Sequence, residues 1–275
     1  ADQLFLWMEK RQQPMHVAGL QLFNFPEDAG PRYIRDLVEH LRTFTEPQHP
    51  FNKRLVRRFG QYFWETDKQF DLEHHFRHRA LPKPGRIREL LSYVSAAHSN
   101  LMDRQRPMWE VHLIEGVQGR RFALYTKVHH SLFDGISAMR MGSRALSTDI
   151  DARDLPPIWA MPPRRKPAGL PNPIDVATGA VRMTSGFSKQ MATMPAVLKE
   201  IAKVARKSQR DPSFVPFMNA PASIINSDIT GSRRFAAQSY PMARFKAVAK
   251  VFGCTLNDVV LAVCGSALRN YLISQ

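Results

Sequence analysis

The sequence predicts a mixed α/β fold, and three stretches carry this prediction. Residues 16–25 read as a strand, and residues 31–44 place apolar side chains at helical spacing. Residues 108–129 read as two strands that flank a turn with two glycines, which is typical of a β-hairpin. Strands that alternate with helices along a chain build sheets covered by helices.

The first predicted helix begins near Pro31, a residue that suits the first helical turn. Its apolar stripe is formed by Ile34, Leu37, Val38 and Leu41. A second helix is predicted over residues 86–102. The hairpin strands are expected at residues 108–115 and 121–129.

The chain has 275 residues, of which 44% are apolar, enough for one large domain or two ordinary ones. Residues 151–173 contain seven prolines, a density that excludes a regular helix or a central strand. We therefore expect a first domain over residues 1–150, a proline-rich linker with crossover helices over residues 151–223, and the start of a second domain over residues 224–275.

The second domain is predicted to contain a strand at residues 233–240 and a helix at residues 242–252 that stops at Gly253. A further helix follows, with Thr255 as its N-cap and Asp258 three residues on, as in a capping box. Since the chain ends within this helical pattern, we expect the second domain to be incomplete in this chain.

The cysteines, the first residues and the longest apolar stretch also indicate the cellular compartment. Cys254 and Cys264 lie ten residues apart on a predicted helix, too far to bridge, so a reducing cytoplasm is expected. The first ten residues contain Asp2 and Glu9 and have no basic segment before an apolar run, so they do not read as a signal peptide. The longest apolar stretch, residues 259–268, is too short to span a bilayer.

The formal net charge of +15 favours a polyanionic partner: nucleic acid, an anionic membrane surface or a phosphate-bearing substrate. Charge alone leaves all three open. One stretch mixes basic and aromatic residues in a way compatible with nucleic acid, namely Phe51, Arg54, Arg57, Arg58, Phe59, Tyr62 and Phe63. No nucleic-acid-binding module is recognisable, so nucleic acid is not the expected partner.

The stretch HHSLFDG, residues 129–135, is the main candidate for chemistry. Side chains alternate along a strand, so His129 and His130 face opposite sides if strand pairing persists. One can then be structural while the other looks into a cleft and takes a proton from a hydroxyl. Asp134 is expected to tighten the loop or orient a ring, and Gly135 to leave room for backbone or substrate. An isolated His-His pair would favour an ordinary turn, but these offsets at a strand-to-helix junction favour function.

A second group of histidines, His74, His75 and His78, raises the alternative of a metal site. No cysteine lies nearby and no zinc-ligand spacing repeats, so no metal is predicted.

The motif HHSLFDG matches the HHxxxDG pattern of the CoA-dependent acyltransferase and condensation-domain superfamily. The chain as a whole resembles the bacterial wax ester synthase/diacylglycerol acyltransferase family more closely. The similarity covers six stretches in order: PMHVAGL (14–20), DLEHHFRHRALPKPG (71–85), RPMWEVHLIEG (106–116), HHSLFDG (129–135), TGSRRFA (230–236) and LNDVVLAVCGSALRNYL (256–272). The short motif alone indicates only the superfamily, whereas the ordered set is specific.

This resemblance implies two chloramphenicol-acetyltransferase-like halves that meet at a cleft, with the proline-rich segment as their crossover. It implies transfer of a fatty acyl group from acyl-CoA to a long-chain alcohol or to diacylglycerol, without a metal or another cofactor. His130 would be the general base, His129 a supporting residue and Asp134 structural. Other members of the superfamily, such as condensation domains or polyketide-associated acyltransferases, remain the alternative, followed by a basic nucleic-acid-binding module.

Five further residues are candidates through the same resemblance. Asn257 and Asp258 match a second motif in the first turn of a helix, where a side-chain amide is placed to bind substrate or oxyanion. Asp258 is equally expected to act only as a cap. Pro107, Trp109 and Glu110 lie in the hairpin beside the catalytic strand and are expected to shape the site.

The expected location is cytoplasmic, with peripheral attachment to the inner membrane or to lipid inclusions. The candidate contact with an anionic membrane or lipid droplet is the amphipathic, basic end of the helix predicted over residues 174–207. A helix that packs on the core and exposes its basic face to water would show the same pattern.

Overall fold

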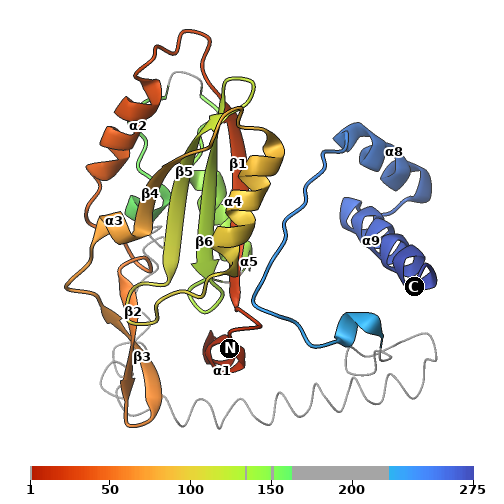
Figure 1. The fold of residues 1–275 in the computed structure, drawn as a ribbon, viewed down its shortest axis with the longest axis horizontal. Coiled ribbons are helices and arrows are strands. Elements are labelled where there is room, and N and C mark those ends of the chain that lie inside the picture. The colour runs from red at the N-terminus through yellow and green to blue at the C-terminus, as the bar shows by residue number, and fades with distance from the viewer. Residues whose placement is uncertain (1, 134, 150–151, 163–222) are drawn as a thin grey trace, which may run out of the picture. The chain divides into compact units, whose positions relative to one another are not determined.

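A computed structural model describes residues 2–133, 135–149, 152–162 and 223–275 (Figure 1). The amphipathic helix predicted over residues 174–207 and most of the predicted linker therefore lie outside the described residues. The division into three segments at residues 150 and 223 stays a prediction.

A four-stranded mixed sheet forms the centre of the N-terminal part, in the order β1-β6-β5-β4. Its strands are β1 (His16–Asn24), β4 (Phe76–Ala80), β5 (Trp109–Val117) and β6 (Arg121–His129). The β1–β6 and β5–β6 pairs are antiparallel, and β4 pairs with β5 in parallel. The predicted strand and hairpin are confirmed, although β5 begins and ends slightly later than expected.

The predicted helices of this part are also confirmed, as α2 (Tyr33–Arg42) and α4 (Ile87–Ser99). Two further helices are α3 (Leu72–His75), whose Glu73 N–H donates to the Asp71 carboxylate at 3.0 Å, and α5 (Gly135–Arg144), which begins at the last residue of the histidine motif. Figure 1 shows α4 and α2 on opposite sides of the sheet.

Both faces of β6 are covered, so its two sets of alternating side chains enter different cores. Val128 and Phe122 pack into a cluster with α2 residues, whereas Ala123 and Tyr125 pack with Leu90 and Val94 of α4. His129 has the same parity as Ala123 and Tyr125, and it is buried. The strand pattern therefore decides where the first motif histidine lies.

The beginning of the proline-rich segment belongs to the first core. The short 3₁₀ helix η1 (Ile158–Ala160) inserts Trp159, which is 1% exposed, and its indole N–H donates to the carbonyl of Phe44 at 3.0 Å. Proline density excluded regular structure in this segment, but it did not exclude a single buried anchor.

Besides α3, β4 and short 3₁₀ helices, three elements were not predicted. They are the helix α1 (Asp2–Met8) and the two strands of a separate hairpin, β2 (Lys53–Arg58) and β3 (Gln61–Thr66). The hairpin turn is Phe-Gly, which lacks the Asn-Gly or Asp-Gly signature on which a hairpin prediction rests. Phe51, placed with this basic-aromatic stretch, is instead a core residue with 1% exposure.

The C-terminal helices are confirmed as α8 (Met242–Phe252) and α9 (Leu256–Ile273). Gly253 ends α8 in the left-handed region, with φ 59°. Among the described residues no single helix is long and apolar enough to cross a membrane, and α8 with α9 meets those criteria only as a pair bent by 102°.

The strand predicted at residues 233–240 is wrong, because that segment has no strand structure. The backbone N–H groups of Arg233 and Phe235 donate instead to the hydroxyls of Ser99 and Ser95 on α4, at 2.9 and 2.8 Å. Two alternate backbone N–H groups of this extended segment thus donate hydrogen bonds to serine hydroxyls, and not to the carbonyls of a neighbouring strand.

Replacement of Gly85 by alanine should destabilise the N-terminal part by about 3 kcal/mol, because the residue combines two constraints. Its φ is +70°, and a Cβ there would overlap the carbonyl oxygen of Gly116 at the end of β5. Gly19→Ala is the matched control, since a Cβ on Gly19 meets nothing within 4 Å. Urea unfolding of both variants tests this, and equal stabilities would contradict it.

Candidate active site

The histidine motif lies where β6 ends, between the segments that lead into two neighbouring strands. The backbone N–H of His129 donates to the carbonyl of Met108, at 3.0 Å, just before β5. The next N–H, of His130, donates to the carbonyl of Met15, at 2.9 Å, just before β1. The two histidines are therefore fixed by different neighbours at the same sheet edge.

His129 is fully buried and its ring is held at both nitrogens. Its Nδ1 accepts a hydrogen bond from the Ser131 N–H at 3.1 Å, and the Ser131 hydroxyl lies 2.6 Å from the same atom. Because Nδ1 is an acceptor, the proton of the neutral ring is on Nε2. Nε2 lies 3.3 Å from the Oε1 atom of Glu9. This arrangement fixes one tautomer and sets Nε2 against the Glu9 carboxylate.

Glu9, which follows α1, gathers donors from three other parts of the chain. Its carboxylate accepts from the N–H of Met15 at 3.1 Å and from the guanidinium of Arg104 at 2.8 and 3.1 Å, in addition to the contact with His129. Burial by itself would raise the pKa of Glu9, but the hydrogen bonds from His129, Arg104 and Met15 lower it to about 2. The Glu9 carboxylate is therefore ionised at neutral pH, in contact with His129 of the motif.

His130 is held differently, by stacking. Its half-buried ring lies on the ring of Phe5 from α1, with centroids 4.0 Å apart and planes at 22°. Its Nδ1 is buried, and it has no hydrogen-bond partner in the part of the chain that the structure describes. Other histidine nitrogens, among them Nε2 of His75, are also buried without a hydrogen-bond partner in the described residues. Of the two motif histidines, however, His130 is the one whose ring is not fixed by a charged or polar side chain there.

The rest of the motif is described only in part. Asp134 lies outside the described residues, so its predicted structural role stays a prediction. Gly135 is the first residue of α5. The strand-to-helix junction expected after the histidines is present, with Ser131 and Phe133 buried between them.

The three candidates at the start of β5 occupy different environments. Pro107 is buried, and Trp109 is a core residue whose indole N–H donates to the carbonyl of Phe51 at 2.8 Å. Glu110 lies 3.1 Å from His112 Nε2. They belong to the scaffold next to the motif, which is compatible with the predicted shaping role.

Glu110 stays ionised. Burial by itself would raise its pKa, but the hydrogen bond from His112 and the charges of Lys127 and Arg77 lower it to about 2. A carboxylate with so low a pKa is a poor proton carrier near pH 7. Glu110 is thus suited to orient neighbours and not to exchange protons.

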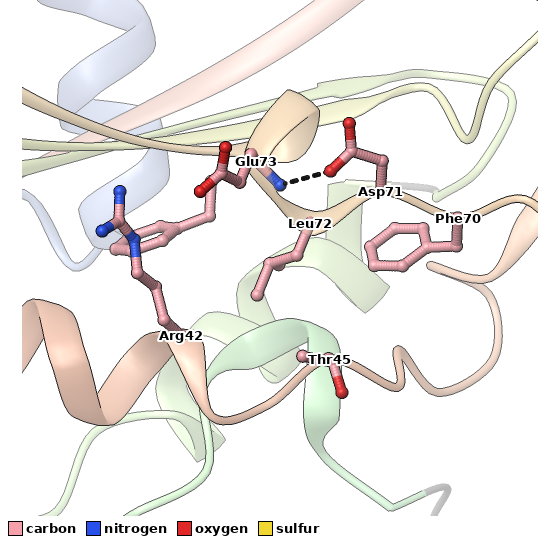
Figure 2. A pocket seen from close by; sticks show the side chains of 7 residues that line it. Arg42, Thr45, Phe70, Asp71, Leu72 and Glu73 are labelled. Atoms are coloured by element: carbon pink, nitrogen blue, oxygen red, sulfur yellow. Dashed lines mark hydrogen bonds between the residues drawn. The ribbon is translucent and has the colours of Figure 1, made fainter.

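Two of the cavities in the described part of the chain lie near β4 and β5, and neither is lined by the histidine motif. One, of about 390 Å³, is bordered by Glu110 and His112 together with His74, Arg77 and Tyr93. The other, of about 360 Å³, lies between the end of α2 and α3; Figure 2 shows Arg42 and Glu73 with the apolar side chains of Phe70 and Leu72. The size of these cavities therefore gives no indication that a substrate binds at His130.

The histidines of residues 74–78 do not converge. The His75 ring stacks on Trp109 and its Nδ1 lies 2.8 Å from the carbonyl of that residue, whereas His78 pairs with Glu115 at 3.1 Å. Over residues 2–133, 135–149, 152–162 and 223–275, no group of three or more His, Cys, Asp or Glu side chains is arranged to hold a metal ion. These histidines are structural in the described part of the chain.

Asn257 and Asp258 lie in the first turn of α9, and both are exposed. The Asp258 carboxylate accepts from the N–H and the hydroxyl of Thr255, at 2.8 and 2.7 Å, while the Asp258 N–H donates back to that hydroxyl. The predicted capping box is confirmed. These hydrogen bonds from Thr255 lower the pKa of Asp258. The Asn257 side chain takes no part in this cap.

Glu9 was not identified from the sequence as a site residue. Its partners Arg104 and His129 lie 95 and 120 positions away, so no local pattern reveals the contact. The available signal was a single carboxylate directly after an apolar run, LFLWM, and shortly before the PMHVAGL stretch.

Glu9→Gln should lower the free energy of unfolding by roughly 2–3 kcal/mol at pH 7, because the buried anion is lost beside Arg104 and His129. The pKa of Glu9 is depressed from 4.5 to about 2, so its stabilisation is present above pH 4.5 and is lost as the pH falls toward 2. Urea unfolding of wild type and variant at pH 7 and pH 3 measures the difference, which should shrink at pH 3.

The control for this prediction is Glu39→Gln on α2, where an exposed carboxylate pairs with Arg35 at 3.6 Å. Exposed pairs contribute little, so the change should stay within about 0.5 kcal/mol. A Glu9→Gln effect as small as the control, or one independent of pH, would contradict the structural role of this anion.

Comparisons with known proteins identify relatives of this chain. The family model described as the wax ester synthase/diacylglycerol acyltransferase catalytic domain matches residues 1–260. The chain is 46% identical to O-acyltransferase WSD of Acinetobacter baylyi, covering 100% of this chain and 59% of that protein. It is 40% identical to the probable diacyglycerol O-acyltransferase tgs2 of Mycobacterium tuberculosis, covering 100% and 60%.

A solved wax ester synthase/diacylglycerol acyltransferase from Marinobacter aquaeolei is 53% identical, with a TM-score of 0.74, over 100% of this chain and 60% of that one. The chain thus spans about 60% of the length of these relatives. The mixed α/β fold predicted from the sequence is confirmed. On the family-model match and the ordered motifs, the chain belongs to the wax ester synthase/diacylglycerol acyltransferase family.

Proposed function

We propose that the protein transfers a fatty acyl group from acyl-CoA to the hydroxyl of a long-chain alcohol or of diacylglycerol, with His130 as general base. The observation that carries this proposal is the contrast between the two histidines. The His129 ring is fixed by Ser131 at Nδ1 and by the Glu9 carboxylate 3.3 Å from Nε2, whereas the His130 ring stacks on Phe5 and has no charged or polar partner at its buried Nδ1 in the described residues.

The proposed reaction needs no covalent enzyme intermediate. The His130 ring takes the proton of the acceptor hydroxyl as its oxygen attacks the thioester carbonyl. The tetrahedral intermediate then collapses, the carbon–sulfur bond breaks, and the proton passes from His130 to the CoA sulfur. A positioned base contributes roughly 10²–10⁴-fold to such a step, and orientation of the two substrates supplies much of the rest.

The protein environment supports this assignment through the fixed first histidine. His129 and the Glu9 carboxylate hold the end of β6, and the next residue carries the base. Phe5 covers one face of the His130 ring, which limits its orientation and its hydration. His129 and Glu9 are thus proposed as positioning residues, and Asp134 keeps its predicted structural role.

The proposed acceptors are lipids, so the protein is expected to act where lipids are found. The names of the relatives include both wax ester synthase and diacylglycerol acyltransferase, which supports both acceptor classes. We propose acyl-CoA as the donor, and no cofactor is assigned. A basic chain with net charge +15 that acts on such acceptors is expected at the cytoplasmic face of an anionic membrane or on lipid inclusions.

His130→Ala should reduce acyl transfer by at least about a hundredfold, since it removes the proposed base. The assay combines palmitoyl-CoA with hexadecanol or diacylglycerol and measures both free thiol and ester. Circular dichroism should show the native fold, because the His130 ring is only half-buried. His78→Ala, which removes a half-buried histidine paired with Glu115, is the matched control and should keep its activity. Undiminished transfer by His130→Ala would refute the proposal.

We further propose that Asn257 binds substrate while Asp258 only caps α9. Asp258→Glu keeps the capping-box pattern with Thr255 and should retain activity. Asn257→Asp replaces the amide donor by an acceptor and should reduce kcat roughly a hundredfold, as loss of an oxyanion donor does. Steady-state kinetics with palmitoyl-CoA compare the two variants, and the reverse order of effects would exchange the two roles.

A further inference from the structure

The β2–β3 hairpin ends in an unusual turn. Figure 1 shows this hairpin as a projection from the end of the four-stranded sheet. Phe59 and Gly60 form the two-residue turn, and both have positive φ, 51° and 78°. Phe59 is fully exposed, with a relative accessibility of 103%.

Phe59 contributes nothing visible to the fold. Two-residue turns with positive φ at both positions favour Asn, Asp or Gly, and a bulky side chain there is strained. A fully exposed aromatic ring also gains no burial in return. Strain that the surrounding structure does not need is an indication of function.

The residues around the turn are basic and partly apolar. Four cations lie on the hairpin, Lys53, Arg54, Arg57 and Arg58, against one acidic residue, Glu65. Arg58 and Arg54 lie 2.6 and 3.9 Å from Glu65. Exposed Phe63 and Trp64 follow on β3. The hairpin therefore combines net positive charge with exposed aromatic side chains.

Helix α1 extends this surface and connects it to the candidate site. Leu6 is buried in one cluster with Leu55 of β2, and the Trp7 ring meets the ring of Tyr62 at 6.4 Å. Trp7 is 68% exposed, and Leu4 is exposed beside it. The same helix carries Phe5, which stacks on His130. We call Leu4, Trp7, Phe59, Phe63 and Trp64, with the hairpin cations, the hairpin surface.

We propose that the hairpin surface docks on an anionic phospholipid bilayer, with Phe59 and Trp7 entering the interface. This inference rests on the proposed function, because lipid acceptors are found at such a surface. Aromatic rings between cations suit the interface of an anionic bilayer. Aliphatic Leu4 favours lipid over nucleic acid, since a base stacks on aromatic rings and gains little from an aliphatic side chain.

The native tryptophans test docking directly. Trp7 and Trp64 are exposed, whereas Trp109 and Trp159 are each 1% exposed. Phosphatidylglycerol vesicles with brominated acyl chains should quench the fluorescence of the exposed pair, and brominated phosphatidylcholine vesicles should quench much less. Trp7→Phe and Trp64→Phe should each remove part of the quenched signal. Emission that the anionic vesicles leave unchanged would overturn the proposal.

Phe59→Asn separates docking from folding, because the two readouts should move in different directions. Asparagine suits the positive φ, so the melting temperature should stay the same or rise. Vesicle affinity should fall about tenfold or more, since the inserted ring is lost. Phe59→Trp should retain affinity. A lower melting temperature with unchanged vesicle affinity would make Phe59 a structural residue and overturn the proposal.

A matched pair of charge variants tests whether the position of the cations matters. Lys53→Gln with Arg57→Gln should weaken binding to phosphatidylglycerol vesicles about tenfold, and added salt should reduce the difference. Arg32→Gln with Arg35→Gln removes the same charge from the exposed start of α2 and should change affinity little. Equal losses in both pairs would show attraction by net charge alone and overturn the assigned surface.

Activity measurements keep this proposal distinct from the proposed function. With detergent-dispersed hexadecanol and no vesicles, Phe59→Asn should transfer acyl groups as wild type does. Docking by a wild type that lacks transfer activity would refute the proposed function and leave the hairpin surface intact. Salt-sensitive oligonucleotide binding that competes with vesicles and is lost in Phe59→Asn would assign the surface to nucleic acid instead.

Discussion

The buried carboxylate of Glu9 is the interaction on which the arrangement of the candidate site depends. It joins the end of α1, the segment before β1, the loop that carries Arg104, and the end of β6 through His129. A buried anion is tolerated only when donors surround it, so these four segments must come together for the fold to be stable. The position of His130 follows, because it is the next residue after His129.

Strand geometry explains why two adjacent histidines have different tasks. His129 continues the alternation of β6 toward the side of α4, where it is buried with Tyr125 and Ala123. His130 follows the last residue of the strand, so its ring is free to stack on Phe5 of α1. The motif therefore combines a residue that fixes the backbone with one whose ring is available for chemistry.

The sequence predicted those parts of the fold that are encoded locally. The apolar stripe of α2, the strands around the β5–β6 turn and the cap of α9 each follow from residues within a few positions of one another. Segment 233–240 also reads locally as a strand, but the donors of that backbone are taken by serines of α4, more than 130 positions away. A local pattern does not reveal which partner will satisfy the backbone.

The features that were missed depend on distant contacts or on atypical local chemistry. Helix α1 is short, and its order comes from Leu6 in a distant cluster, from Phe5 on His130 and from Glu9 after its last residue. The β2–β3 hairpin lacks conventional turn residues, because its turn carries an exposed phenylalanine. Where a local rule is broken without gain in packing, function is the remaining physical reason for the residue.

Helix α1 contacts both the candidate site and the β2–β3 hairpin. Buried Leu6 packs in the hairpin cluster and half-buried Phe5 stacks on the His130 ring, while Trp7 is exposed beside Tyr62. A helix of seven residues has little stability of its own, so it persists only through these contacts. The surface that we propose for lipid docking and the ring that we propose for proton transfer therefore share one support, α1, which the Glu9 anion connects to the end of β6.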